Sequence, residues 1–187
     1  MSRSLRAIAV SSCLLAAGVS STAVAAAPTL RAHSLFGAPQ FHVGAVALID
    51  AHHAPGKITE VCMDPAPIDQ PSCSASHNLA PSKTGTTKVK ATFADGSSAT
   101  TTLNVKAAAR KVGGMVPVPG HVTCKSVTLY GNYDTKTDRF RGKLATVGQG
   151  SNVALYNRIG KRALFMWNYK TNKSGFGSVS CAKPGLN

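Results

Sequence analysis

Acidic residues are scarce in this 187-residue sequence, which has seven Asp and Glu against 21 Lys and Arg and a formal net charge of +14 with His neutral. The scarcity is uneven. Residues 28–105 hold five bases and five acids, whereas residues 106–187 hold fourteen bases and only two acids, Asp134 and Asp138. The second segment therefore carries +12. Because such a field opposes folding through self-repulsion, it indicates a use in solubility or in binding an anionic partner.

Several catalytic and metal-binding motifs are also absent. The sequence has no G-x-S-x-G, no H-E-x-x-H and no phosphate-cradling glycine loop, which argues against the enzyme classes that depend on them. No C-x-x-C pair is present, and the adjacent His52 and His53 lack the spacing of convergent metal ligands. We therefore expect no metal and no cofactor.

Long hydrophobic runs are missing except at the N-terminus. There, Arg3 and Arg6 precede a short apolar run, residues 7–19, and a small-residue exit that ends at Ala25. This order is typical of a secretory signal peptide, residues 1–25. No later segment approaches the length that spans a bilayer, so we expect a secreted or periplasmic mature chain. In an alternative interpretation, Cys13 is a lipidation site that tethers the protein.

The mature chain retains four cysteines, Cys62, Cys73, Cys124 and Cys181. An even number of cysteines in an exported protein indicates disulfides, here two bonds with three possible connectivities. We favour Cys62–Cys73 with Cys124–Cys181, because each bond then closes one half of the chain.

Short apolar runs separated by turn residues predict a mainly β protein, a disulfide-stabilised antiparallel sandwich or barrel-like domain or pair of domains. We find no convincing capped helix after the signal peptide. The composition divides the chain into a neutral β-rich domain, 28–105, a Gly- and Pro-containing linker, 106–120, and a basic β-rich domain, 121–187. The expected strands are 41–49, 58–63, a hairpin within 86–105, 122–130, 140–147, 153–157, 163–169 and 176–181.

The spacing of apolar residues around Asp95 and Gly96 limits the length of the hairpin loop. The apolar residues on both sides of the turn occupy odd positions, and a two-residue loop would pair odd with even positions and split the apolar face. We therefore expect a longer loop or a bulge within residues 94–98.

Aromatic and basic residues alternate in the C-terminal half. On a strand, Arg139 and Arg141 point to one side and Phe140 to the other, which predicts a wet basic face over a packed aromatic one. Arginine there can contact phosphate, sulfate or carboxylate in a bidentate manner. Phe165 and Trp167 are expected to be core. The candidate binding residues are Arg139, Arg141, Lys143, Arg158, Lys161, Arg162 and Lys170.

These observations favour an exported, non-enzymatic protein that binds an anionic polymer or an acidic surface. They do not distinguish nucleic acid, lipopolysaccharide and cell-wall polymer. One alternative is a secreted inhibitor of a protease or other hydrolase that presents the proline-rich loop 62–73. A second is a small secreted nuclease or toxin, in which His121, Asp134 or Asp138 acts beside the basic residues.

Overall fold

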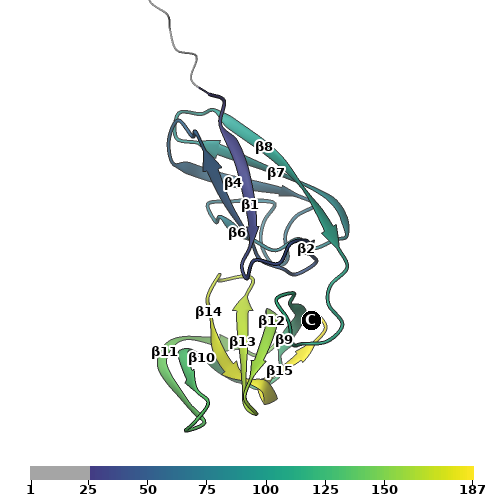
Figure 1. Ribbon diagram of the computed structural model, residues 1–187, viewed down its shortest axis with the longest axis vertical. Helices are drawn as coiled ribbons and strands as arrows, with labels where there is room; N and C mark the ends of the chain where they lie inside the picture. The colour runs from purple at the N-terminus through teal and green to yellow at the C-terminus, as the bar shows by residue number, and fades with distance from the viewer. Residues whose placement is uncertain (1–25) are drawn as a thin grey trace, which may run out of the picture.

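The computed structural model describes residues 26–187, so the predicted signal peptide and Cys13 lie outside the described residues. The chain forms two β lobes, which we call the N-terminal lobe, residues 26–106, and the C-terminal lobe, residues 118–187 (Figure 1). A short 3-10 helix, η1 (Val179–Cys181), is the only helical element of the described chain. The prediction of a mainly β protein is confirmed.

The N-terminal lobe consists of two sheets. The smaller has the order β1-β3-β6 and contains β1 (Thr29–Ser34), β3 (Ala47–His52) and β6 (Asn78–Leu79). The larger has the order β2-β8-β7-β4-β5 and contains β2 (Phe41–His42), β8 (Ser98–Lys106), β7 (Gly85–Phe93), β4 (Ile58–Asp64) and β5 (Cys73–Ser74). Both sheets contribute to one buried core, which includes Leu30, Ile49, Leu79, Val61, Val89, Phe93 and Leu103.

The β7–β8 hairpin resolves the parity problem as predicted. Residues 94–97 form a four-residue loop, closed by a hydrogen bond of 2.9 Å from the Phe93 N–H to the Ser97 carbonyl oxygen. This loop places odd residues opposite odd residues, as in the pair of Ala91 and Ala99. The apolar side chains of both strands consequently face the same core, and the polar ones face solvent.

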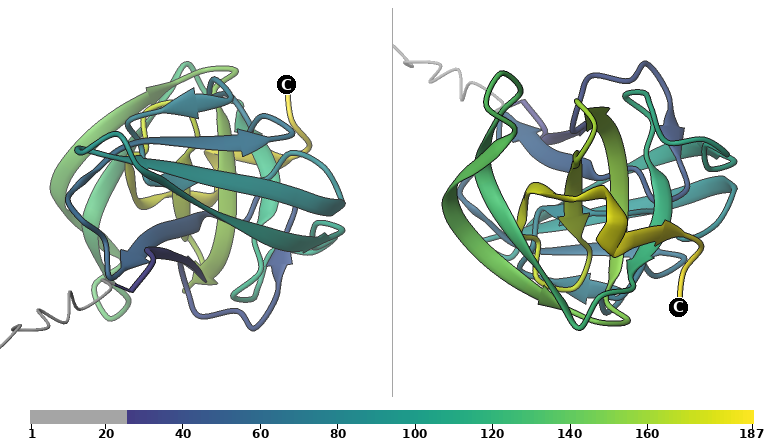
Figure 2. Two further views of the ribbon diagram at one scale, coloured as in Figure 1. Left: turned by 90° about the horizontal axis from the view of Figure 1, so that it is seen from above. Right: turned by 90° about the horizontal axis from the view of Figure 1, so that it is seen from below.

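The C-terminal lobe is one sheet of seven strands in the order β11-β10-β14-β13-β12-β9-β15. Although three strands separate β11 from β12 in this order, only residues 149–151 connect them, so the sheet must curve around its core (Figure 2). The strands are β9 (Val118–Val122), β10 (Ser126–Asp134), β11 (Arg139–Gly148), β12 (Asn152–Ile159), β13 (Ala163–Asn168), β14 (Ser174–Ser178) and β15 (Ala182–Pro184).

Four sequence predictions differ in detail from these bounds. The expected strand 176–181 ends at Ser178, immediately before η1 begins. The expected strand 122–130 is interrupted at residues 123–125, where Cys124 is bonded to Cys181. The expected strand 41–49 is likewise two strands, β2 and β3. Within the segment predicted as a linker, only residues 107–117 lack strand structure, and Ala109 and Val112 of this connection pack against the core of the C-terminal lobe.

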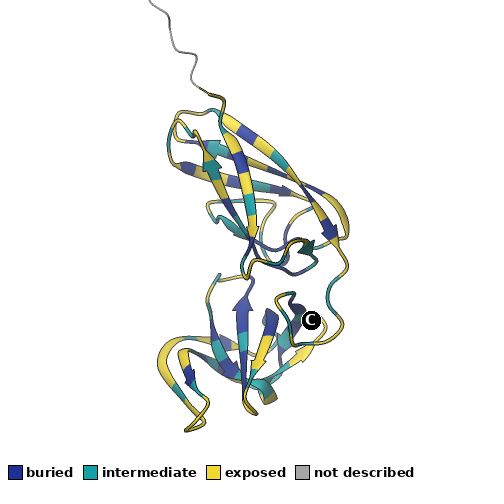
Figure 3. Cartoon of the chain, in the orientation of Figure 1, coloured by how far each residue is buried: buried dark blue, intermediate teal, exposed yellow. Residues whose placement is uncertain are grey.

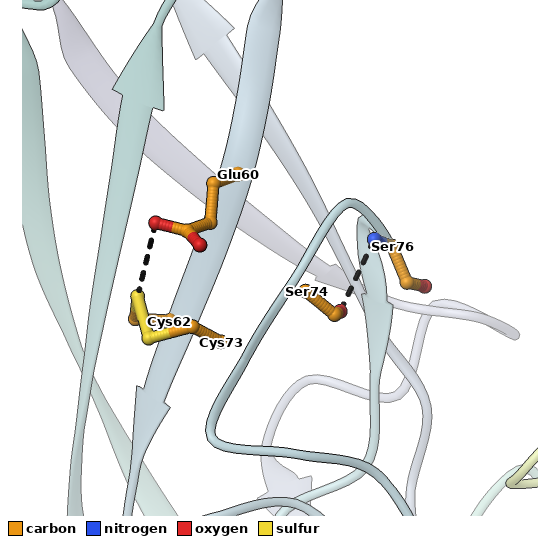
Figure 4. Close-up of a disulfide and its surroundings, with 5 residues drawn as sticks. All are labelled: Glu60, Cys62, Cys73, Ser74 and Ser76. Atoms are coloured by element: carbon orange, nitrogen blue, oxygen red, sulfur yellow. Dashed lines mark hydrogen bonds between the residues drawn. A yellow bond between two sulfur atoms is a disulfide. The ribbon is translucent and has the colours of Figure 1, made fainter.

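Both predicted disulfides are confirmed. Cys62 and Cys73 are cross-strand partners on β4 and β5, and the carboxylate of Glu60 lies 3.7 Å from the Cys62 sulfur (Figure 4). Cys124 and Cys181 are 57 residues apart in sequence, and their bond joins the start of the C-terminal lobe to η1. Each disulfide therefore closes its own lobe.

A third buried cluster, which we call the junction core, joins the two lobes. Its buried members are Val46, Ile68 and Ala80 from the N-terminal lobe and Ala154, Tyr156, Trp167 and Tyr169 from the C-terminal lobe. The Tyr169 hydroxyl donates a hydrogen bond of 3.0 Å to the Gly44 carbonyl oxygen, and the Tyr156 hydroxyl accepts one of 3.3 Å from the Val46 N–H. Strand β13 is buried along most of its length (Figure 3), because one face meets its own lobe's core and the other meets the N-terminal lobe.

Candidate anion-binding site

Two turns lie together at the end of the C-terminal lobe that points away from the N-terminal lobe (Figure 1). One joins β10 to β11 and the other joins β12 to β13. Gly160, at φ 61°, makes the second turn, and a Cβ atom at this position would lie 3.2 Å from the Tyr133 ring. An ion pair of 3.4 Å between Arg162 and Asp138 also links the turns. We call residues 133–143 and 158–162 the distal end.

Six of the seven predicted binding residues are brought together at the distal end. All six are exposed, and Lys136, which was not among the predicted residues, is exposed beside them. The six are Arg139, Arg141, Lys143, Arg158, Lys161 and Arg162.

Lys170 does not join this set. It follows the opposite end of β13 from Arg162, and six strand residues separate the two ends by about 20 Å. Its part in binding stays a prediction, but its position in the fold separates it from the other six residues. Lys170 lies close to the apolar run in sequence, but the direction of the strand carries it to the other end of the lobe.

The two acids of the distal end neutralise part of its charge. Asp134 lies 3.5 Å from Arg141, and Asp138 lies 3.4 Å from Arg162. Within residues 26–187, the other cations of the distal end form no ion pair. Seven cations against two carboxylates leave a local charge of +5.

Hydrogen bonds fix the ionisation of two groups in the β10–β11 turn. The Tyr133 hydroxyl donates to the Asp138 carboxylate, and this bond raises the pKa of Tyr133 above its usual value. Hydrogen bonding by Thr137 lowers the pKa of Asp134. At neutral pH the turn thus holds a protonated phenol and an ionised Asp134 carboxylate, each committed to a neighbour within the same hairpin.

The aromatic residues of the hairpin pack on one another, as predicted. The Phe140 ring stacks on Tyr130 with ring centroids 5.1 Å apart and lies against Tyr133 at 4.9 Å. Phe140 is half-buried, whereas Arg139 and Arg141 on either side of it are exposed. The aromatic packing therefore supports a hairpin that also carries exposed cations.

The residues considered for a nuclease are not brought together. His121 pairs with Asn152 at the start of β12, and Nδ1 of its ring lies 2.7 Å from the Gly185 carbonyl oxygen. Asp134 and Asp138 lie beside the opposite end of β12. The structure therefore does not place the imidazole next to either carboxylate.

The loop closed by Cys62 and Cys73 faces the C-terminal lobe. Ile68, at its apex, is only 5% exposed and belongs to the junction core. Asp69 accepts a hydrogen bond of 3.1 Å from the Asn152 side chain, and the Gln70 side chain donates one of 2.6 Å to the Tyr169 carbonyl oxygen. Because the apex is covered in this way, the geometry does not support presentation of the loop to a hydrolase.

Sequence reasoning did not find the contact between the lobes. The signal was present in β12 and β13, where the runs 153–156 and 163–169 are apolar or aromatic at nearly every position rather than at alternate ones. Continuous runs are typical of strands covered on both faces. Phe165 and Trp167 were expected to be core residues, and the core they enter, which also contains Tyr169, is shared between the lobes.

One group of potential metal ligands, Glu60 with Cys62 and Cys73, clusters among the described residues. Both sulfurs are consumed by the disulfide, so no thiolate remains to bind a metal.

No helix in residues 26–187 has both the length and the apolar character needed to cross a membrane. Comparisons with protein-family models, curated proteins and solved structures found no match.

Proposed function

We propose that this chain is an exported, non-enzymatic binding protein whose distal end engages an anionic polymer. In this proposal the signal peptide directs export, the N-terminal lobe is a β-sandwich, and the barrel-like C-terminal lobe carries the binding surface. The polymer classes that match the cations are nucleic acid, lipopolysaccharide and acidic cell-wall polymer.

One observation carries the proposal. Two separate turn segments, 136–143 and 158–162, gather seven exposed cations at one end of the molecule, while the lobe at the other end, residues 26–106, has six bases against five acids and a net charge of only +1. Two turns held together by Arg162, Asp138 and Tyr133 make this end a defined surface rather than a scatter of charges.

The test uses the full mature chain, because the shared junction core makes isolated lobes unsuitable. We expect the triple variant R139Q/K143Q/K161Q to elute from immobilised heparin at a clearly lower salt concentration than the unmodified chain. None of the three residues forms an ion pair in the described structure, so the variant should keep its fold. The slope of log affinity against log salt should become shallower by about 0.7 to 0.9 for each cation that no longer pairs with the polymer.

The matched control is K83Q/K88Q/K90Q, which removes the same charge from exposed positions of the N-terminal lobe. This variant should elute close to the unmodified chain. If both triple variants bind with the same reduced affinity, binding follows net charge alone, and the proposal of a distal site is wrong.

A further inference from the structure

A polar pocket of about 530 Å³ lies at the other end of the C-terminal lobe, beside the junction with the N-terminal lobe. It is formed where the β11–β12 turn, the β13–β14 turn and the apex of the 62–73 loop meet. The side chains that line it include Asp69, Thr146, Asn152, Asn168, Lys170 and Thr171. The proposed polymer site does not use this pocket.

Asn168 provides the most specific feature of the pocket. The residue is only 3% exposed, and its Oδ1 atom accepts hydrogen bonds of 2.8 Å and 2.9 Å from the backbone N–H and the hydroxyl of Thr171. Within residues 26–187, its side-chain nitrogen donates no hydrogen bond to another protein group. The nitrogen is not one of the buried side-chain atoms that lack a partner in the described residues, so it reaches solvent in the pocket, where an occupant can accept a hydrogen bond from it.

Two opposite charges line the same pocket without meeting. Asp69 uses Oδ1 to accept from Asn152, which leaves its second oxygen without a protein donor in the described structure. Lys170 is exposed at the pocket's edge, and no ion pair within 4.0 Å joins it to Asp69. The pocket thus offers a carboxylate that can pair with a cation and an ammonium that can pair with an anion, separated by more than the length of a direct ion pair.

We infer that this pocket binds a small zwitterion of the amino-acid class. Its carboxylate contacts the Lys170 ammonium and the Asn168 amide, and its own ammonium contacts Asp69. A ligand with both charges satisfies all three protein groups, whereas a simple anion would leave Asp69 unpaired and experience its repulsion. A neutral sugar would satisfy hydroxyl-bonding groups but neither charge.

The experiment is an NMR titration of the full mature chain, followed through the Asn168 side-chain amide and the backbone amides of residues 148–152. The probes are glycine and L-alanine, with acetate, methylammonium and glucose as partial or neutral ligands. We expect saturable shifts with the zwitterions and an affinity about tenfold above that of acetate or methylammonium, equivalent to the gain of one charge-assisted contact.

Two variants and two controls assign the contacts. K170M and D69N should each weaken glycine binding about tenfold, whereas K173M and D64N, which remove like charges outside the pocket lining, should leave it within about twofold. Lys170 makes no side-chain hydrogen bond or ion pair in the described structure, so K170M is expected to fold even if D69N loosens the junction.

Other outcomes overturn the inference. Equal binding of acetate and glycine would show an anion site that ignores Asp69, and tighter binding of glucose would show a saccharide site. No shift with any probe would show that the pocket is only a gap between loops. The distal-end proposal is unaffected by these results, because the two sites share no residue.

Discussion

The hairpin β7–β8 and the hairpin β12–β13 are both antiparallel, yet their sequences have different periods. In β7 and β8, buried and exposed residues alternate, because one face meets the core and the other meets solvent. In β12 and β13, nearly every residue from 152 to 156 and from 163 to 168 is buried. The difference shows that a strand's outer neighbour, and not its own sheet, decides whether its sequence alternates.

The same comparison explains where the positive charge lies. The N-terminal lobe covers the outer face of β12 and β13 at the end where the junction core lies, and an uncompensated cation buried there would be costly. At the distal end nothing in the described structure covers the two turns, and cations remain hydrated. The buried parts of β12 and β13 therefore carry no Lys or Arg, and the cations of this hairpin lie outside them, at Arg158, Lys161 and Arg162 and, beyond the other end of β13, at Lys170.

The strongest way to break this arrangement is to empty the junction core. Trp167→Ala should lower the free energy of unfolding by about 3 to 5 kcal/mol, the range for deleting a large buried aromatic side chain. Hydrogen exchange should show faster exchange at Val46 and in β13, with β7 affected only through global unfolding. Phe93→Ala, in the core of the N-terminal lobe, is the matched control and should act on β7 directly. Identical exchange patterns for both variants would contradict a separate junction core.

The disulfides allow the lobes to be weakened one at a time. The double variant C124A/C181A removes a bond that spans 57 residues, and C62A/C73A removes one that spans 11. Loop-closure entropy predicts decreases in the free energy of unfolding of about 4 and about 3 kcal/mol, respectively. Urea unfolding followed by circular dichroism measures both. A greater decrease for the shorter loop would mean that the packing of the 62–73 apex on the C-terminal lobe outweighs chain entropy.

Gly44 tests how closely the lobes approach. Its φ of 78° favours glycine, and a Cβ atom there would lie 2.5 Å from Pro119 and 2.6 Å from the Tyr169 hydroxyl. Gly44→Ala should therefore cost about 3 kcal/mol, from backbone strain together with overpacking. Gly37→Ala is the control, because Gly37 has a φ of 69° and nothing within 4 Å of the added atom, so only about 1 kcal/mol is expected. Thermal unfolding of the two variants isolates the effect of the close approach, and equal shifts in Tm would argue against it.

The four tyrosines all lie in the C-terminal lobe, and burial raises the pKa of Tyr156 and Tyr169 well above the ordinary 10.0. Since the folded state holds these protons more tightly than the unfolded state, their stabilisation is complete below pH 10 and is lost as the pH rises further. Each group should contribute a slope of up to about 1.4 kcal/mol per pH unit. Unfolding between pH 9 and about 11.5 should show this slope, and Tyr156→Phe should reduce it; an unchanged slope in Tyr156→Phe would contradict this account.

Those parts of the fold and of the candidate site that depend on local spacing along the chain or on the nearest partner could be predicted from the sequence. The disulfide pairs, the four-residue β7–β8 loop and the packing of Phe140 away from Arg139 and Arg141 all depend on parity or on nearest partners. The position of Lys170 and the covering of Ile68 depend instead on which strand ends meet in space. No single segment of the sequence determines either the position of Lys170 or the covering of Ile68. Only the unbroken apolar runs of β12 and β13 indicate that this hairpin is covered on both faces.

The smallest expected change in stability accompanies an informative change in binding. Asp134 and Asp138 are the two acids of the distal end, and each pairs with one arginine at an exposed position, where ion pairs contribute little. An asparagine oxygen can still accept the hydrogen bonds that Asp138 takes from Tyr133 and that Asp134 takes from the N–H groups of Lys136 and Thr137. The variant D134N/D138N should therefore shift Tm only slightly, while its affinity for heparin at low salt should rise by about threefold through the added local charge. The matched variant D50N/D64N makes the same change in net charge within the N-terminal lobe. If the distal end is the binding surface, only the first variant gains affinity, whereas equal gains would mean that the polymer senses the molecule as a whole.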